Sequence, residues 1–212
     1  MVSIDVFIDS NVLANWMLLD GAAQKAKQSP ERLQEIQERA GRKWPSFQLL
    51  EELRRIGNPP SFISSFKFGT SAFAIAETSH VILQEYIAGS LYKKGIPFAY
   101  WESFSKQEQL SKRDQEDLIS QLDHLLETFF NPEHQILYRM DGMTTDFTTV
   151  SILVTSFRLS TTDAFLVSQA TKRGCDYFLT EDKPLRDLLP RYKRMSMISA
   201  QEMLSQLKQI KN

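Results

Sequence analysis

Four acidic residues stand where the sequence pattern places the end of a strand or the first turns of a helix. These residues are Asp9, Glu77, Asp163 and Asp182. Carboxylates with so many apolar neighbours are costly to bury unless they pair with, or bind, cations. If the chain brings them together, their oxygen atoms form the ligand set that Mg²⁺ and Mn²⁺ prefer. The pattern therefore predicts a divalent-metal site.

Such a site has a specific chemical use. Three or four carboxylates can hold one or two ions that activate a water molecule and stabilise the leaving oxygen during phosphodiester cleavage. The sequence contains neither a glycine-rich phosphate loop nor a nucleophile elbow that would indicate other chemistry. With 26 acidic residues in the chain, any one of them is equally typical of a helix cap or a solvated group. The prediction therefore depends on the joint pattern.

The elements that would position these acids alternate along the chain. Apolar runs predict strands at residues 2–9, 62–68, 135–140, 176–180 and 195–199. Helical patterns lie between them, at about 11–19, 71–91, 148–158, 163–173 and 200–211. Alternation of this kind favours an α/β fold, with a mainly parallel sheet of about four or five strands sandwiched by helices. Ligands of such sheets bind beyond the carboxyl ends of the strands, where Asp9 and Asp182 are expected.

The local signals at helix ends refine these boundaries. Thr70 or Ser71 is a plausible N-cap for the helix that contains Glu77, and Thr161 or Thr162 for the helix that starts near Asp163. Gly174 marks the end of the latter helix, because glycine readily takes the left-handed conformation that ends many helices.

Two polar segments interrupt the alternation, and we interpret the chain as a single domain, 1–212, with helical insertions at about 22–60 and 93–134. The first insertion carries eight basic and five acidic residues, whereas the second carries five basic and eight acidic ones. These charges are consistent with two solvated helical faces. Alternatively, the basic segment contacts a phosphate backbone.

Composition limits the possible classes of protein. The chain is 42% hydrophobic and 24% charged, which is ordinary for a globular domain. Its single cysteine, Cys175, excludes an internal disulfide and is interpreted as a small buried residue. No run of apolar residues is long enough for a membrane span, and the first residues do not read as a signal peptide. We therefore expect a cytoplasmic protein without membrane contact.

The four acids also occur in motifs that resemble those of PIN domains. These motifs are Asp9-Ser10-Asn11 after the first strand, Ser71 with Glu77 six positions on, Asp163-Ala164 at a helix start, and Thr180-Glu181-Asp182 after a strand. The order and the placement of all four agree with that family. The resemblance covers roughly residues 2–20, 61–92 and 135–205.

The resemblance implies a metal-dependent endoribonuclease. By analogy with the family, Asp9, Glu77, Asp163 and Asp182 are both the metal ligands and the catalytic residues, and they hold Mg²⁺ or Mn²⁺. Asn11 and Thr180 would orient the carboxylates, and the expected products carry 5′-phosphate and 3′-hydroxyl ends. Glu181 is either an additional ligand or a solvent-facing neighbour. RNA is the implied substrate, and self-association is frequent in the family.

Alternatives remain open at this point. Small PIN-domain toxins of toxin–antitoxin pairs lack long insertions, so the insertions could instead cover the active-site groove, read an RNA or hold a protein partner such as an antitoxin. Some PIN domains are non-catalytic modules that bind RNA or protein. A haloacid-dehalogenase-like phosphatase also places Asp after its first strand, but such enzymes use Asp-x-Asp, whereas this chain has Asn11 at the second position.

A basic cluster follows the fourth acid. Its members are Lys183, Arg186, Arg191, Lys193 and Arg194. Exposed lysine and arginine side chains close to a strand end could bind RNA phosphates, and they are equally typical of a solvated loop.

Overall fold

Five parallel strands form one sheet in the order β3-β2-β1-β4-β5 in this computed structural model. The structure describes residues 3–57, 66–140, 146–187 and 192–211. The strands are β1 (Ile4–Ile8), β2 (Phe66–Thr70), β3 (Tyr138–Arg139), β4 (Tyr177–Leu179) and β5 (Ser196–Ile198). The central strand β1 pairs with β2 on one side and with β4 on the other, so both of its edges are hydrogen-bonded.

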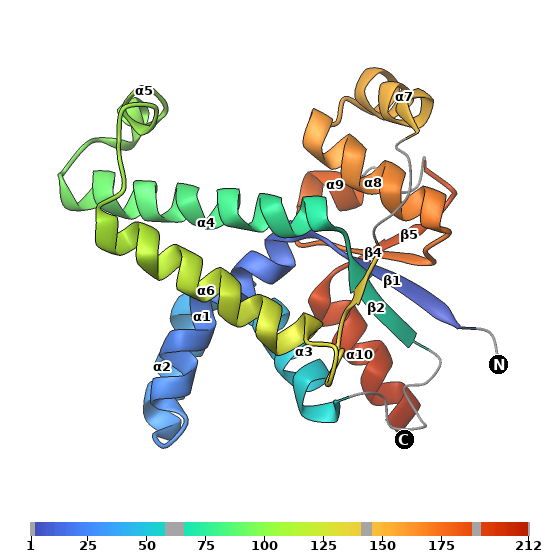
Figure 1. The fold of residues 1–212 in the computed structure, drawn as a ribbon, viewed down its shortest axis with the longest axis horizontal. Coiled ribbons are helices and arrows are strands. Elements are labelled where there is room, and N and C mark those ends of the chain that lie inside the picture. Colours follow the sequence, from blue (N-terminus) through green and yellow to red (C-terminus); the bar gives the residue numbers. More distant parts are fainter. Residues whose placement is uncertain (1–2, 58–65, 141–145, 188–191, 212) are drawn as a thin grey trace.

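Helices cover both faces of this sheet, which makes the fold a three-layer α/β arrangement (Figure 1). The helices are α1 (Ser10–Ala26), α2 (Pro30–Ala40), α3 (Trp44–Ile56), α4 (Ala72–Lys93), α5 (Trp101–Ser105), α6 (Lys112–Phe130), α7 (Phe147–Phe157), α8 (Thr161–Arg173), α9 (Lys183–Asp187) and α10 (Ala200–Lys211). Short 3₁₀ turns, η1 (Gly41–Lys43) and η2 (Phe98–Tyr100), precede α3 and α5. No described helix is long and apolar enough to cross a membrane.

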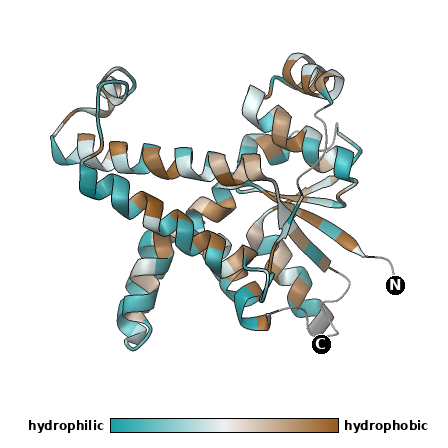
Figure 2. Ribbon diagram, viewed as in Figure 1, coloured by the Kyte–Doolittle hydropathy of each residue, from teal (hydrophilic) through white to brown (hydrophobic). Residues whose placement is uncertain are grey.

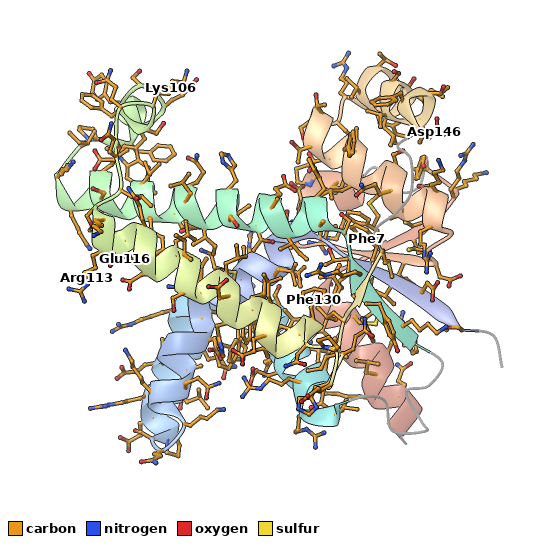
Figure 3. All side chains as sticks on the ribbon, viewed as in Figure 1. Phe7, Lys106, Arg113, Glu116, Phe130 and Asp146 are labelled. Atoms are coloured by element: carbon orange, nitrogen blue, oxygen red, sulfur yellow. The ribbon has the colours of Figure 1, made fainter. Side chains whose placement is uncertain are left out.

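Strand alternation divides the apolar residues between two cores. Val6 and Ile8 point to one face, where α1, α3, α4, α6 and α10 pack. Phe7 points to the other face, where it stacks on Phe178 at a centroid distance of 5.4 Å and contacts the side chains of α7 and α8. Phe7 is labelled between the sheet and these helices in Figure 3. This alternation follows from the two-residue period of a strand.

A glycine permits the pairing at one end of the sheet. At Gly69 in β2, an added Cβ atom would lie 2.6 Å from the carbonyl oxygen of Tyr138 and 2.7 Å from the Cε atom of Met140. These distances are far below van der Waals contact. The residue without a side chain therefore allows β3 to pair closely with β2.

The two segments interpreted as insertions contribute to the core. In the first segment α3 buries Leu49 and Leu50, whereas α2 has no buried residue and is largely hydrophilic in Figure 2. In the second segment α6 buries Leu125 and Phe129. The helices α3 and α6 are therefore structural parts of the larger core.

Beyond that core, α4 and α6 run side by side away from the sheet, with α5 at the far end (Figure 1). Tyr86 on α4 accepts a hydrogen bond from Gln121 on α6 over 2.9 Å. Near the tip, Glu108 forms an ion pair with Lys94 over 2.6 Å and accepts a hydrogen bond from Ser90 over 2.7 Å. The first of these contacts joins α4 to α6, and the other two hold the segment between α5 and α6 against the end of α4.

The element order and the α/β class agree with the sequence prediction, but several boundaries differ. The first helix continues past residue 19 to Ala26. The second strand covers residues 66–70 instead of 62–68, and residues 62–65 lie outside the described part. The third strand covers two residues of the predicted 135–140, because only Tyr138 and Arg139 pair with β2. Apolar periodicity locates a strand in sequence, whereas its ends depend on the neighbouring strand.

Candidate functional site

Asp9 lies at the centre of the candidate site, at the carboxyl end of the central strand. Its backbone N–H bonds the carbonyl oxygen of Leu179 on β4, and its side chain caps α1 by accepting the N–H of Ser10 over 2.7 Å. The side chain is only 3% exposed. The position therefore fixes a buried carboxylate between the end of β1 and the beginning of α1.

Two side chains bond the second oxygen of this carboxylate. Asn11 donates its Nδ2 proton to Asp9 Oδ2 over 2.7 Å, and the hydroxyl of Thr180 donates to the same oxygen over 2.7 Å. Asn11 is itself held, because its Oδ1 accepts the N–H of Glu181 over 3.1 Å. All of these donors are neutral, so they orient Asp9 without cancelling its charge.

Glu77 on α4 also lies at this site, next to Ser10. Ser71 caps α4 by accepting the N–H of Ala74, and Glu77 follows almost two turns later. The hydroxyl of Ser10 donates to Glu77 Oε2 over 2.9 Å and lies 3.3 Å from Asp9 Oδ1. Ser10 therefore links two of the predicted acids.

Asp163 is the third acid of this group. It lies in the first turn of α8, where its carboxylate accepts the hydroxyl proton of Ser160 over 2.6 Å. Ser160 is also the N-cap, since its side chain accepts the N–H of Asp163. The prediction of Thr161 or Thr162 as the cap was wrong, because this reciprocal pair one residue earlier satisfies the first turn.

Burial and repulsion shift the protonation of these acids. The pKa of Asp9 is raised to about 7, mainly because burial penalises its charged form, and the charges of Glu77 and Asp163 raise it further. The hydrogen bonds from Thr180 and Ser10 act in the opposite direction. The pKa of Glu77 is also raised, first by burial and then by Asp163. Glu77 and Asp163 are therefore close enough to Asp9 to destabilise its charge.

The fourth predicted acid is oriented elsewhere. Asp182 lies beside the site, because its N–H donates to Thr180 Oγ1 over 3.1 Å. Its carboxylate, however, accepts the N–H of Leu185 over 2.9 Å at the start of α9. Glu181 neither joins the acids nor faces solvent freely, since it accepts the N–H of Ala200 over 2.8 Å. Both side chains therefore cap helices in this structure.

The electrostatics and the ligand chemistry of the site fit a divalent cation. Among the described residues, no lysine or arginine forms an ion pair with Asp9, Glu77 or Asp163. Their oxygen atoms are hard ligands, and a cation would offset the burial and the repulsion that raise the pKa values of Asp9 and Glu77. Within the described part of the chain, no three acidic, histidine or cysteine side chains yet lie at metal-binding distances. Binding would therefore require side-chain rearrangement.

The members of the basic cluster after Asp182 differ in their surroundings. Arg186 lies 3.9 Å from Glu202 on α10, whereas Lys193 and Arg194 are exposed. Arg191 lies outside the described residues. Cys175 is buried, as expected, and burial raises the pKa of its thiol to about 12.

Sequence reasoning missed the role of Ser10. Its position inside the Asp-x-Asn motif was visible, but its contact with Glu77 joins residues 67 positions apart. It also missed Phe73, Phe147 and Phe165, whose rings meet at one side of the acids. No local pattern connects these three residues, because they lie on three different helices.

The fold and the site define an α/β protein with a group of acidic residues, of which Asp9 is buried, at the carboxyl edge of a parallel sheet. No family model matches the chain, and no solved structure matches it significantly. A protein of Archaeoglobus fulgidus, described as "Uncharacterized protein", is 33% identical over 115 residues, which cover 52% of this chain and 87% of the archaeal protein. The chain belongs to the same family as that archaeal protein.

Proposed function

We propose that this protein is a metal-dependent endoribonuclease whose reaction centre is formed by Asp9, Glu77 and Asp163. The observation that carries the proposal is the environment of Asp9. This carboxylate is buried, is oriented by neutral donors from three residues, and lies close to two further acids. Burial, with a smaller contribution from the charges of these acids, raises its pKa to about 7. A group with these neighbours gains stability from a cation, and pKa values perturbed in this way are typical of functional sites.

The residues of the site would have separate roles. Asp9, Glu77 and Asp163 would hold Mg²⁺ or Mn²⁺, and Asp182 would join them if it left the N-terminus of α9. When bound, the ion lowers the pKa of a water molecule and stabilises negative charge on the phosphate. Asn11 and Thr180 keep Asp9 oriented, and Ser10 does the same for Glu77.

Two further arguments support RNA as the substrate. The ordered motifs around the four acids resemble those of PIN domains, in which this constellation cleaves RNA. The acids also lie beyond the carboxyl ends of parallel strands, where ligands of open α/β sheets bind. A cytoplasmic location, self-association and an antitoxin partner remain predictions from the sequence. A small open reading frame upstream of the gene would support the antitoxin.

RNA cleavage in the presence of Mn²⁺ tests the proposal. We expect Asp9→Asn and Asp163→Asn to cleave at least about 100-fold more slowly than the parent, because each removes a ligand charge. The matched control is Asp117→Asn on the exposed face of α6, which should cleave at the parental rate. Circular dichroism and thermal melting must show that all variants fold. Parental rates in both site variants would place the reaction centre elsewhere.

One observation favours a second function, a non-catalytic module that binds RNA or protein. The acids do not lie at metal-binding distances in the described part of the chain, and Asp182 caps a helix. Thermal melting with added Mg²⁺ or Mn²⁺ separates the two functions. A cation at one hundred times its Kd should stabilise the nuclease by about 2.7 kcal/mol, and Asp9→Asn should remove this effect. No response at millimolar concentrations would favour the binding module.

A further inference from the structure

Three phenylalanine rings form a partly exposed aromatic surface beside the acids. We call this surface, made of Phe73 on α4, Phe147 on α7 and Phe165 on α8, the aromatic shelf. The ring centroids of Phe73 and Phe165 are 5.1 Å apart, and those of Phe147 and Phe165 are 6.4 Å apart. Phe73 is 39% exposed and Phe147 is 70% exposed. Single exposed apolar residues are ordinary, but contacting aromatic rings on a surface indicate a binding site.

The shelf is joined to the acidic group by two helices. Phe73 precedes Glu77 by four residues on α4, so the two side chains lie on the same helix face. Asp163 and Phe165 both belong to the first turns of α8. The same two helices therefore bring acids together at one place and aromatic rings together beside it. A ligand with a planar ring and a phosphate matches this arrangement, provided that a cation held by the acids binds the phosphate.

A basic pocket continues from the far end of the shelf. Phe147 lines a cavity of about 580 Å³ together with Lys172 and Arg194. Asp146, labelled in Figure 3 at the beginning of α7, also lines this cavity. Hydrogen bonds from Thr149 contribute most to lowering the pKa of Asp146, and the charge of Lys172 lowers it a little further. Lys172 lies nine residues after Asp163 on α8, roughly 14 Å along the helix axis.

We propose that the aromatic shelf is a base-stacking subsite that holds an unpaired nucleobase next to the phosphate at the acidic group, while Lys172 and Arg194 attract a neighbouring phosphate. The proposal rests on the nuclease function proposed above. Exposed aromatic rings stack on any base, because every base has a flat face, and a basic groove follows the backbone. A paired base is already stacked within its duplex and cannot lie on the shelf.

Binding of a fluorescent single-stranded RNA of 12 nucleotides, measured by anisotropy in EDTA, tests the subsite without requiring catalysis. We expect Phe147→Ala to weaken binding about tenfold and Phe147→Trp to restore it, because stacking on one ring contributes that much. Lys172→Ala should reduce the slope of log affinity against log salt by about one. The matched control is Phe98→Ala, since Phe98 is 80% exposed but lies at the tip near α5.

The possible outcomes separate the subsite from the nuclease. If the parent binds the single strand through Phe147 but never cleaves it, the nuclease function fails and the subsite stands. The subsite is refuted if Phe147→Ala and Phe73→Ala both bind the single strand as tightly as the parent. It is also refuted if Phe147→Ala weakens the binding of duplex RNA as much as the binding of the single strand. Sedimentation that shows a dimer lost on Phe147→Ala would instead identify the shelf as a contact between two copies of the chain.

Discussion

Two buried aspartates of α1 and its N-terminus have opposite environments. Asp9 is 3% exposed and Asp20 is 6% exposed, so both carboxylates have lost almost all contact with water. Asp20 lies 3.8 Å from the guanidinium of Arg54 and 3.2 Å from the imidazole of His124, and it accepts a bond from Gln24. Asp9 accepts bonds only from neutral groups among the described residues and is close to two other acids.

The partners of Asp20 belong to a network that connects three helices. Arg54 on α3 also pairs with Glu51, which accepts the indole N–H of Trp16 on α1 over 3.0 Å. The imidazole of His124 on α6 stacks on the same indole, with centroids 5.6 Å apart. The charge of Asp20 is therefore used within the fold, to hold α1, α3 and α6 against one another.

The difference shows how to distinguish a structural acid from a functional one. Burying a carboxylate costs several kcal/mol, and the chain offsets this cost at Asp20 with the guanidinium of Arg54 and the hydrogen bond to His124. At Asp9 the chain supplies no such group within the described residues, and adds repulsion from Glu77 and Asp163. The missing positive charge must then come from a proton or from a bound cation. Three predictions test this contrast.

The largest expected effect concerns the pH dependence of folding. The pKa of Asp9 is about 7 in the folded state and 3.8 in the unfolded chain. Between these two pH values the folded protein binds a proton that the unfolded chain releases. The contribution of Asp9 to stability therefore falls as pH rises from about 4 to about 7, and levels off above the folded-state pKa. Relative to Asp9→Asn, the parent should lose on the order of 3 kcal/mol between pH 5 and pH 8.

Denaturant unfolding in EDTA at the two pH values measures this difference. Asp117→Asn is the control, because Asp117 is exposed and its removal should leave the parental pH profile unchanged. Parallel profiles for the parent and Asp9→Asn would contradict a raised pKa, and with it the contrast between the two aspartates.

The second prediction concerns Asp20. Replacing Asp20 with alanine removes the acceptor that faces His124 and Arg54, and should lower the free energy of unfolding by about 2 kcal/mol. Asp123→Ala on the exposed face of α6 is the control, since it makes the same helix-favouring change without breaking the network. RNA cleavage and the Mn²⁺ response should persist in Asp20→Ala. Loss of the cation response there would show that the two acids are coupled.

The smallest effect is expected at Ser10. Ser10→Ala removes the hydroxyl that bonds Glu77 Oε2, and should cost about 1 kcal/mol in the absence of metal. The variant should also raise the pKa of Glu77 further, because the Ser10 bond lowers it. Nuclear magnetic resonance titration of the Glu77 carboxyl measures this shift. Ser156→Ala on the exposed face of α7 is the control, and an equal effect in both variants would argue against the link.

Much of the fold was visible in the sequence because strands and helices have different apolar periods. The run before Asp9 and the run before Thr180 both became strands, and Gly174 ends α8 in the left-handed conformation with a φ of 76°. The ends of a strand were harder to predict where pairing with a neighbouring strand decides them, as in β3. The projecting pair of helices α4 and α6 was not predicted as such, because its contacts join residues far apart in the chain.

The sequence by itself determined the parallel α/β class, the acidic residues at the strand and helix ends, and the neutral donors Asn11 and Thr180 near them. These features follow from local periodicity and from short motifs. Only the tertiary structure decided that Asp9, Glu77 and Asp163 share one electrostatic environment, that Asp182 turns to cap α9, and that three phenylalanines meet beside the acids. Charge repulsion and ring contact depend on distance in space, and the distance between helices is set by how their apolar faces pack on the sheet.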